Sequence, residues 1–156
     1  MTVIVAVLVV VIVQTFIFKG CIVDGRSMMP TLKDGDRGFS FVINKIFGID
    51  RFDVVIVSDV EEAKYIVKRV IGLPNEIVEY RNNELYINGE KFEEDFLADD
   101  AYTGDLYYEL KDDEYFVLGD NRQVSKDSRY YGPFSGRDIV AKDFLVFWPL
   151  NSIGFK

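Results

Sequence analysis

The sequence predicts a mainly β protein, with an antiparallel β-sheet domain behind one N-terminal transmembrane helix. From Gly38 onward, apolar residues recur mostly with a period of two, and β-branched runs end at turn residues. Residues 2–18 differ, because they form one apolar run without a charged residue. The 156 residues suffice for one modest domain in addition to this run.

The apolar run is the predicted membrane anchor. At ~1.5 Å per residue, a helix over residues 2–18 is ~25 Å long, and Lys19 can extend toward the headgroups beyond a ~30 Å hydrocarbon core. A removable signal peptide fits less well, because the run has no basic residue before it and no small-residue cleavage site after it. A buried strand accounts for only part of the run. We therefore expect residues 1–20 to form a transmembrane anchor and residues 21–156 a separate β-rich domain.

The candidate strands follow one another with turn residues between them. They are residues 53–57, 65–71, 78–80, 85–87, 115–118, 139–140 and 144–147. Gly72 and Pro74 end the second of these strands. The polar residues 81–84 read as the turn region of a hairpin, and Asn88-Gly89 is typical of a second turn, of type I′. Only residues 43–47 have a helical pattern.

Acidic side chains are concentrated between the middle strands, at residues 93–95, 99–100 and 112–113. We expect a short insertion around residues 80–112, and we expect the acidic stretch 93–114, which overlaps its end, to be a solvated excursion between strands. A calcium site is not predicted, because the stretch lacks a D-x-D-x-D-G loop. We therefore expect no metal ion.

Composition restricts the available chemistry. The sequence has no histidine, which excludes Ser-His-Asp triads, Cys-His pairs and zinc sites with histidine ligands. Its single cysteine, Cys21, excludes an intrachain disulfide. We expect a free thiol there, because Lys19 disfavours a lipoprotein attachment signal. An acyl-transfer enzyme of this composition needs another base, and a buried lysine is the available alternative.

The charge of the chain excludes one class of partner. The formal net charge is −8, from 18 basic and 26 acidic residues. Nucleic-acid binding needs clustered lysine and arginine to contact phosphates. We therefore expect no nucleic-acid partner.

Three short stretches carry the candidate chemistry. The first is Gly25-Arg26-Ser27-Met28-Met29-Pro30-Thr31-Leu32, and Gly35-Asp36-Arg37 follows it. The second is Tyr65-Ile66-Val67-Lys68-Arg69-Val70-Ile71-Gly72-Leu73-Pro74, and the third is Gly119-Asp120-Asn121-Arg122 continued by Ser125-Lys126-Asp127-Ser128-Arg129. Pro30 restricts its own φ and pushes Met29 toward an extended conformation, so we expect a rigid extended turn that holds Ser27.

In their order and residue patterns, these stretches resemble the conserved sequence motifs of bacterial type I signal peptidases. The matching patterns are S-M-x-P-T-L, K-R-V-I-G-L-P and G-D-N-R-x-x-S-x-D-S-R, and the similarity continues through residues 147–150. The resemblance implies a membrane-anchored serine endopeptidase with a Ser/Lys dyad. Such an enzyme removes signal peptides from exported preproteins, after small residues at −1 and −3.

The resemblance also implies where the protein acts. It places a signal-peptidase-like antiparallel β-sheet catalytic domain on the extracytoplasmic side of the cell membrane, behind a single-pass anchor. The positive-inside rule alone favours the opposite orientation, because Lys19 and Arg26 follow the apolar run. Preprotein signal peptides and membrane lipid are the implied partners, and no organic cofactor is implied.

By position, Ser27 resembles the nucleophile of the family and Lys68 the general base. In a strand, Ile66, Lys68 and Val70 share one face, so Lys68 has apolar neighbours and Arg69 points the other way, toward an acidic partner. Burial among apolar side chains penalises the ammonium form and lowers the pKa of a lysine. A base that must be neutral near pH 7 needs this effect, because the ordinary pKa is ~10.4.

Four further residues have roles that the resemblance implies. Ser125 resembles a serine that hydrogen-bonds the lysine side chain, and Asp127 and Arg129 resemble a supporting ion pair, which we expect on an extended segment. Gly25 stands where some members of the family have a serine that stabilises the oxyanion, and it permits close approach of the substrate backbone. The backbone N–H of Ser27 is the first candidate for an oxyanion donor.

Two departures from the family pattern leave alternatives open. Asn75 stands in a turn where glycine is usual, and Phe52 stands where a glycine precedes Asp-Val-Val. A specialised relative for pilus or surface-protein assembly is one alternative. A catalytically silent anchored binding module is disfavoured by the presence of both Ser27 and Lys68. A self-cleaving Ser/Lys repressor is disfavoured because a membrane run precedes the dyad, in place of a DNA-binding domain.

Overall fold

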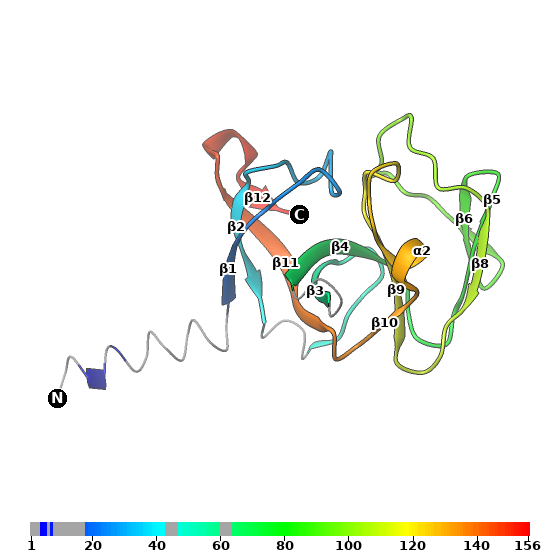
Figure 1. Cartoon of the computed structure of the whole chain (residues 1–156), viewed down its shortest axis with the longest axis horizontal. Helices are drawn as coiled ribbons and strands as arrows, with labels where there is room; N and C mark the ends of the chain where they lie inside the picture. Colours follow the sequence, from blue (N-terminus) through cyan, green and yellow to red (C-terminus); the bar gives the residue numbers. More distant parts are fainter. Residues whose placement is uncertain (1–3, 6, 8–17, 43–46, 60–63) are drawn as a thin grey trace.

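The computed structural model describes residues 4–5, 7, 18–42, 47–59 and 64–156. They form two antiparallel sheets that lie side by side (Figure 1). The larger sheet contains β1 (Phe18–Ile22), β2 (Arg37–Phe41), β3 (Val54–Asp59), β4 (Lys64–Gly72), β9 (Glu114–Leu118), β10 (Phe134–Ser135), β11 (Ile139–Trp148) and β12 (Gly154–Phe155). The short helix α2 (Ser128–Tyr131) precedes β10, and the 3₁₀ helix η2 (Leu150–Ser152) precedes β12.

The order of strands in the larger sheet is β1-β2-β11-β3-β4-β9-β10, and β12 pairs with β11. The last long strand of the chain therefore lies in the middle of the sheet, between two strands from its first half. Side chains secure this long-range pairing, because the Ser40 hydroxyl donates to the Asp143 carbonyl at 2.7 Å and the Lys142 ammonium donates to the Asp53 carboxylate at 2.8 Å.

The smaller sheet is a meander of β7 (Glu90–Phe92), β6 (Glu84–Ile87) and β5 (Ile77–Arg81), with β8 (Leu106–Glu109) on the other side of β5. Asn82 and Asn83 connect β5 to β6 and have φ values of 52° and 66°. Asn88 and Gly89 connect β6 to β7 and have φ values of 51° and 84°. Two successive positive φ values define a type I′ turn, which asparagine and glycine tolerate best. Both predicted turns are therefore confirmed.

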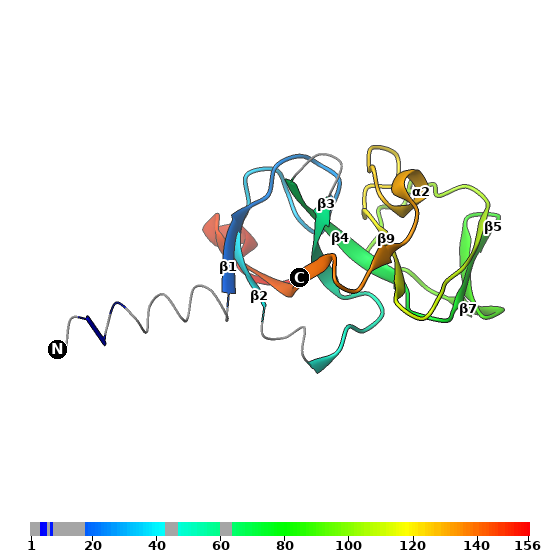
Figure 2. The same cartoon turned by 60° about the horizontal axis from the view of Figure 1, so that its bottom comes forward.

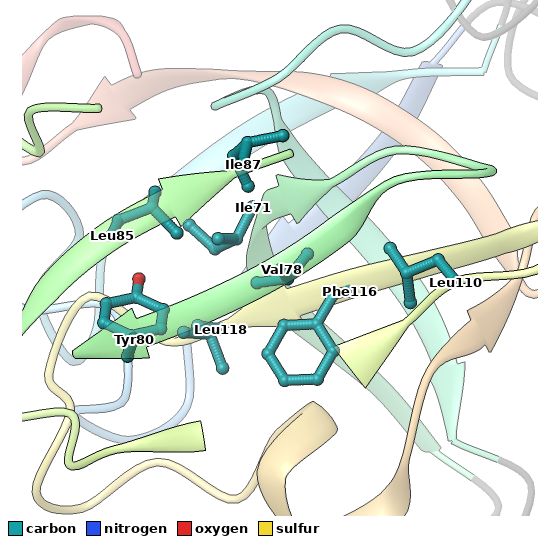
Figure 3. Close-up of a cluster of buried hydrophobic side chains, with 8 residues drawn as sticks. All are labelled: Ile71, Val78, Tyr80, Leu85, Ile87, Leu110, Phe116 and Leu118. Carbon is teal, nitrogen blue, oxygen red and sulfur yellow. The ribbon is translucent and has the colours of Figure 1, made fainter. Parts of the chain in front are cut away.

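One apolar core joins the two sheets. Its members come from β4, β5, β6, β9 and the segment after β8 (Figure 3), and they are Ile71, Val78, Tyr80, Leu85, Ile87, Leu110, Phe116 and Leu118. Gly72 ends β4 where the sheets meet, and a Cβ on it would overlap Val78 and come within 2.7 Å of Leu110. A residue without a side chain is needed there for the two sheets to pack together.

A second core lies under the turn that carries Ser27. Met28 and Leu32, both on this turn, are almost fully buried and pack with Val23, Val54 and Phe144. Burial of such side chains contributes on the order of 2 kcal/mol each. The turn is therefore fixed to the large sheet by its own apolar residues.

The mainly β, antiparallel prediction is confirmed, and the expected strands correspond to β3, β4, β5, β6, β9 and β11. The stretches 139–140 and 144–147, expected as separate strands, are parts of the one strand β11. One prediction is wrong, because the stretch expected to be an excursion, residues 93–114, contains β8 at Leu106–Glu109. Only four residues form this strand, and they alternate between half-buried and exposed beside acidic residues. The strand depends on pairing with β5, which the local pattern does not reveal. Residues 43–46 of the predicted helical segment lie outside the described residues.

Most of the predicted anchor, residues 1–3, 6 and 8–17, also lies outside the described residues. Among the residues that are described, no helix is long and apolar enough to cross a membrane. Strand β1 begins at Phe18, which pairs with Phe41, so the β domain includes the last three residues that were expected to belong to the anchor. Cys21 on this strand is a free thiol, and burial raises its pKa to about 11.

Candidate active site

Ser27 lies on the turn between β1 and β2. The turn is closed by the Leu32 N–H, which donates to the Met28 carbonyl at 2.9 Å. It also rests against the loop after β9, where the Asn121 N–H donates to the Ser27 carbonyl at 3.0 Å. A Cβ on Gly119 would overlap the Ser27 carbonyl and the Ser125 side chain. The first and third sequence stretches therefore meet at a backbone contact that needs a glycine.

Lys68 lies on β4 and points toward Ser27. Its ammonium nitrogen Nζ is 2.9 Å from Ser27 Oγ and 3.0 Å from the Val67 carbonyl oxygen. The side chain is buried, with 3% of the residue exposed, whereas Ser27 is half-buried. The structure thus brings together the two residues predicted for the dyad, although 41 positions separate them in the sequence.

Burial lowers the pKa of Lys68 to about 8. Asp127 opposes this effect and raises the pKa, Lys64 lowers it further, and Asp120 and Arg129 have smaller effects of opposite sign. With this value, a substantial fraction of the side chain is neutral near pH 8, and that fraction can accept a proton from Ser27. The predicted cause, desolvation on an apolar strand, is the dominant one.

We expect Lys68→Met to stabilise the protein at pH 7. A lysine with a folded pKa of about 8 instead of 10.5 costs roughly 3 kcal/mol below pH 8, because folding must desolvate its ammonium. Methionine keeps most of the volume without a charge. The hydrogen bonds to Ser27 and Val67 are lost, at about 1 kcal/mol each. The net gain at pH 7 is therefore about 1 kcal/mol, measured by urea unfolding in detergent.

The pH dependence tests the cause of that gain. Between pH 8 and ~10.4 the unfolded chain binds a proton at Lys68 that the folded chain does not, so the wild-type stability rises with pH relative to the variant. The advantage of Lys68→Met should fall by about 2 kcal/mol between pH 7 and pH 10. Lys111→Met, at an exposed lysine, serves as the control and should show no such trend. A pH-independent difference for Lys68→Met would contradict a depressed pKa.

Arg69 points away from the dyad, as predicted, and its acidic partner is Asp120. Its Nε and Nη2 donate to the two Asp120 carboxylate oxygens at 2.8 and 2.7 Å, and Nη1 donates to the Phe52 carbonyl. The Thr31 hydroxyl donates to the same carboxylate, and the Phe96 ring lies 4.1 Å from the guanidinium carbon. This buried pair therefore links the Ser27 turn, β4 and the loop after β9.

Asp127 and Arg129 form the predicted ion pair, with Arg129 Nε 2.9 Å from Asp127 Oδ1. The expectation of an extended segment is wrong, because Asp127 is the N-cap of α2 and Arg129 lies in its first turn. α2 lies beside β9 (Figures 1 and 2). The Asp127 carboxylate accepts hydrogen bonds from the Arg129 N–H and from the Gly119 N–H, at 3.2 and 3.0 Å. Asp127 therefore holds the loop that contacts Ser27.

Ser125 lies close to the site but does not make the predicted hydrogen bond to Lys68. Its hydroxyl is buried beside Gly119, and it has no hydrogen-bond partner among the described residues. The hydrogen bonds of the Lys68 ammonium go to Ser27 and Val67 in its place. Ser125 still lies on the loop that packs against the Ser27 turn. Only the orientation of its hydroxyl differs from the prediction.

Arg122 links the loop after β9 to the smaller sheet through hydrogen bonds that the sequence did not predict. Its Nη2 is 2.5 Å from the Glu94 carboxylate and its Nη1 is 3.0 Å from the Tyr80 hydroxyl, which donates to Glu94. The Arg122 carbonyl accepts from Arg129 at 2.7 Å. Glu94 gives no local signal for this role, because it lies in a stretch crowded with acidic residues.

Ser27 and Lys68 line a cleft of about 500 Å³. One wall comes from the segment 22–28 and the other from 64–68, and Val124, Lys126 and Tyr131 complete the lining. Gly25 lines the cleft with a φ of 97° and open space at its Cα, consistent with close approach of a substrate backbone. Among the described residues no cluster of side chains could hold a metal ion.

Known proteins share this arrangement of sequence and structure. The chain is 40% identical to signal peptidase I P of Bacillus subtilis subsp. natto, over 97% of its own length and 88% of the relative. It is 34% identical to signal peptidase I of Streptococcus pneumoniae strain R6, over 90% and 87%. The crystal structure of a signal peptidase I from Enterococcus faecalis V583 superposes with a TM-score of 0.55 at 33% identity, covering 60% of this chain and 95% of that one. Residues 1–148 match the model of the signal peptidase, peptidase S26 family, and the chain therefore belongs to that family of serine peptidases.

Proposed function

We propose that this chain is a membrane-anchored serine endopeptidase that removes signal peptides from exported preproteins. One observation carries the proposal, the 2.9 Å contact between Ser27 Oγ and a buried lysine of lowered pKa in an open cleft. A serine hydroxyl becomes a nucleophile when a neutral base accepts its proton. Lys68 is in position to do this, and its burial provides the neutral form near pH 8.

The reaction then proceeds in two balanced halves. Lys68 accepts the Ser27 proton while Oγ attacks the scissile carbonyl, and the resulting tetrahedral oxyanion accepts a hydrogen bond from the Ser27 N–H. The Lys68 ammonium returns the proton to the leaving amine, so the C–N bond breaks and an ester to Ser27 remains. In the second half, a water molecule gives a proton to Lys68 and attacks the ester carbonyl. The Lys68 ammonium then returns this proton to Ser27 Oγ as the C–O bond breaks, which releases the signal peptide as a carboxylic acid and restores both side chains.

Asp127, Arg129 and Ser125 act as supporting residues in this proposal, and Gly25 leaves room for the substrate backbone. Asp127 connects α2 to the loop of Gly119, which touches the Ser27 carbonyl. Arg129 holds Asp127 and the Arg122 carbonyl together. These contacts keep the nucleophile turn at a fixed distance from β4, and well-oriented groups account for a large part of enzymatic rate enhancement.

A membrane surface is the expected site of action, with the apolar run that precedes β1 as a single-pass anchor and the β domain outside the cytoplasm. Exposed apolar side chains support contact with lipid, because they lie on or next to β1, β2, β11, β12 and η2, neighbouring elements at the β1 end of the larger sheet (Figure 1). They are Ile22, Phe39, Phe147, Trp148, Leu150, Ile153 and Phe155. Phe39 and Phe147 of this set stack with ring centroids 4.9 Å apart, and exposed apolar side chains on neighbouring elements support an interaction site there.

Cleavage of a defined preprotein tests the proposal. Purified in detergent and incubated with a secreted-protein precursor with alanine at −1 and −3, the chain should produce one new amino terminus, identified by mass spectrometry. A matched precursor with tryptophan at −1 should resist cleavage, because the substrate class has small residues there. Absence of cleavage of the alanine precursor would favour a binding module without catalytic activity.

A further inference from the structure

The cleft beside Ser27 is lined by cations, although the chain as a whole is acidic. Its lining includes Arg26, Lys64, Lys68 and Lys126, and one carboxylate, Asp24, is present among the described lining residues. The formal net charge of the chain is −8. Clefts lined by one sign of charge attract ligands of the other sign. Lys68 is assigned to the dyad, so the other cations need a separate explanation.

Lys64 occupies a defined place relative to the dyad. It lies on β4 four residues before Lys68, so the two side chains project from the same face of the strand. At ~3.3 Å per residue, its Cα lies about 13 Å from that of Lys68 along the strand. Lys64 is exposed, unlike Lys68, which places it at the open end of the same cleft. Lys126 is also exposed and lies next to the N-cap of α2.

We propose that Lys64 determines specificity by binding a carboxylate side chain of the peptide substrate, about four residues from the scissile bond. An extended peptide has the same rise per residue as β4, so a residue four positions from the bond at Ser27 lies level with Lys64. Arg26 and Lys126 add to the positive potential of the cleft. The inference rests on the proposed peptidase function and deepens it.

A lysine ammonium suits this role even where it already has a partner. It has three N–H donors, so it can hold a neighbouring group and a substrate carboxylate at the same time. An ion pair at such an exposed position is weak, and it changes kcat/KM by about two- to fivefold. Salt screens exposed pairs, so the preference should disappear at ~0.5 M NaCl.

A set of peptide substrates tests the inference. A neutral parent peptide with alanine at −1 and −3 carries a single Glu or Gln at each position from −6 to +5, and kcat/KM is measured for each pair. For the wild type, the Glu/Gln ratio should reach about two- to fivefold at a position about four residues from the bond, and stay near one elsewhere. Lys64→Gln should reduce the ratio to one, and Lys64→Glu should bring it below one. Asp24→Asn should raise the ratio, because it removes a lining carboxylate.

The ratio also separates two effects of Lys64. Lys64 lowers the pKa of Lys68, so substitution of Lys64 alters the general base as well as the charge at the open end of the cleft. The Glu and Gln peptides encounter the same base in each variant, and their ratio cancels that contribution. Lys111→Gln, at an exposed lysine outside the cleft lining, should keep the wild-type ratio.

Three outcomes would overturn the inference. Cleavage of the parent peptide with Glu/Gln ratios of one at every position would exclude a carboxylate subsite, while leaving the proposed peptidase function intact. Failure to cleave the parent peptide would contradict the proposed peptidase function, on which the inference about Lys64 rests. Anionic lipid is the other source of negative charge, and sedimentation with vesicles of phosphatidylglycerol and phosphatidylcholine tests it. Weaker vesicle binding of Lys64→Gln, with unchanged peptide ratios, would assign Lys64 to lipid instead.

Discussion

Substitution of Ser27 or Lys68 by alanine is expected to reduce kcat/KM for preprotein cleavage by on the order of 10³-fold or more. Ser27→Ala removes the atom that forms the ester, and Lys68→Ala removes the base 2.9 Å from it. Residues that act as one unit give non-additive losses, so the double variant should be no slower than the slower single variant. Single-turnover measurements on a preprotein in detergent would determine all three rates.

Folding controls are needed for this result. Ser27 is half-buried, and Ser27→Ala should retain the thermal unfolding temperature within a few degrees. Ser152→Ala on η2 and Lys111→Ala lie outside the cleft lining, and both should keep wild-type rates. Wild-type turnover by either Ser27→Ala or Lys68→Ala would refute the assigned dyad.

Asp120→Ala should lower the free energy of unfolding by about 3–5 kcal/mol. Asp120 and Arg69 are both buried, at 1% and 7% exposed, and two of the guanidinium nitrogens donate to the carboxylate. Without Asp120, the Arg69 charge stays buried and loses its counter-charge. Thr31 also loses its acceptor, at a further cost for an unsatisfied hydroxyl. Urea unfolding at pH 7 in detergent measures the difference.

A double variant distinguishes charge burial from loss of packing. Asp120→Ala combined with Arg69→Met removes the unpaired charge and keeps an apolar side chain beside Phe96, so it should recover part of the loss. Lys111→Ala breaks a pair with Glu114 that is largely solvent-exposed and should change stability little. A loss below ~1 kcal/mol for Asp120→Ala would show that solvent reaches Arg69 readily.

Local sequence patterns were sufficient to predict the turns and the faces of the strands, because neighbouring residues determine both. The turns at 82–83 and 88–89 were predictable, because asparagine and glycine accept positive φ values. Asn75, in a turn where glycine is usual in the family, has a φ of 66°, which asparagine tolerates. The opposite faces of Lys68 and Arg69 followed from the period of a strand. The sequence predicted an acidic partner for Arg69, but it did not identify that partner as Asp120.

The features that were not predicted depend on distant contacts. β8 pairs with β5 across about 28 residues, and Glu94 meets Arg122 across 28. Ser125 was expected to bond Lys68, but the orientation of one hydroxyl depends on packing around Gly119. Phe52 has a φ of 70°, where glycine is usual in the family. Its ring packs against Phe96 at 5.2 Å, and this contact offsets part of the backbone cost.

The position of β11 also bears on how the enzyme is made. β11 pairs with β2 on one side and β3 on the other, and no other strand in the described part of the chain joins those two. During synthesis, the chain emerges with its N-terminal part first, and the pairing partner of both strands emerges about 80 residues after β3. The β5-β6-β7 meander of the smaller sheet has neighbouring partners and short turns, so it can form early. The turn that carries Ser27 packs on Phe144 and Val146 of β11. A nascent chain therefore lacks the support of the Ser27 turn until β11 (Ile139–Trp148) has been synthesised, and the active site can be completed only after that strand has paired with β2 and β3.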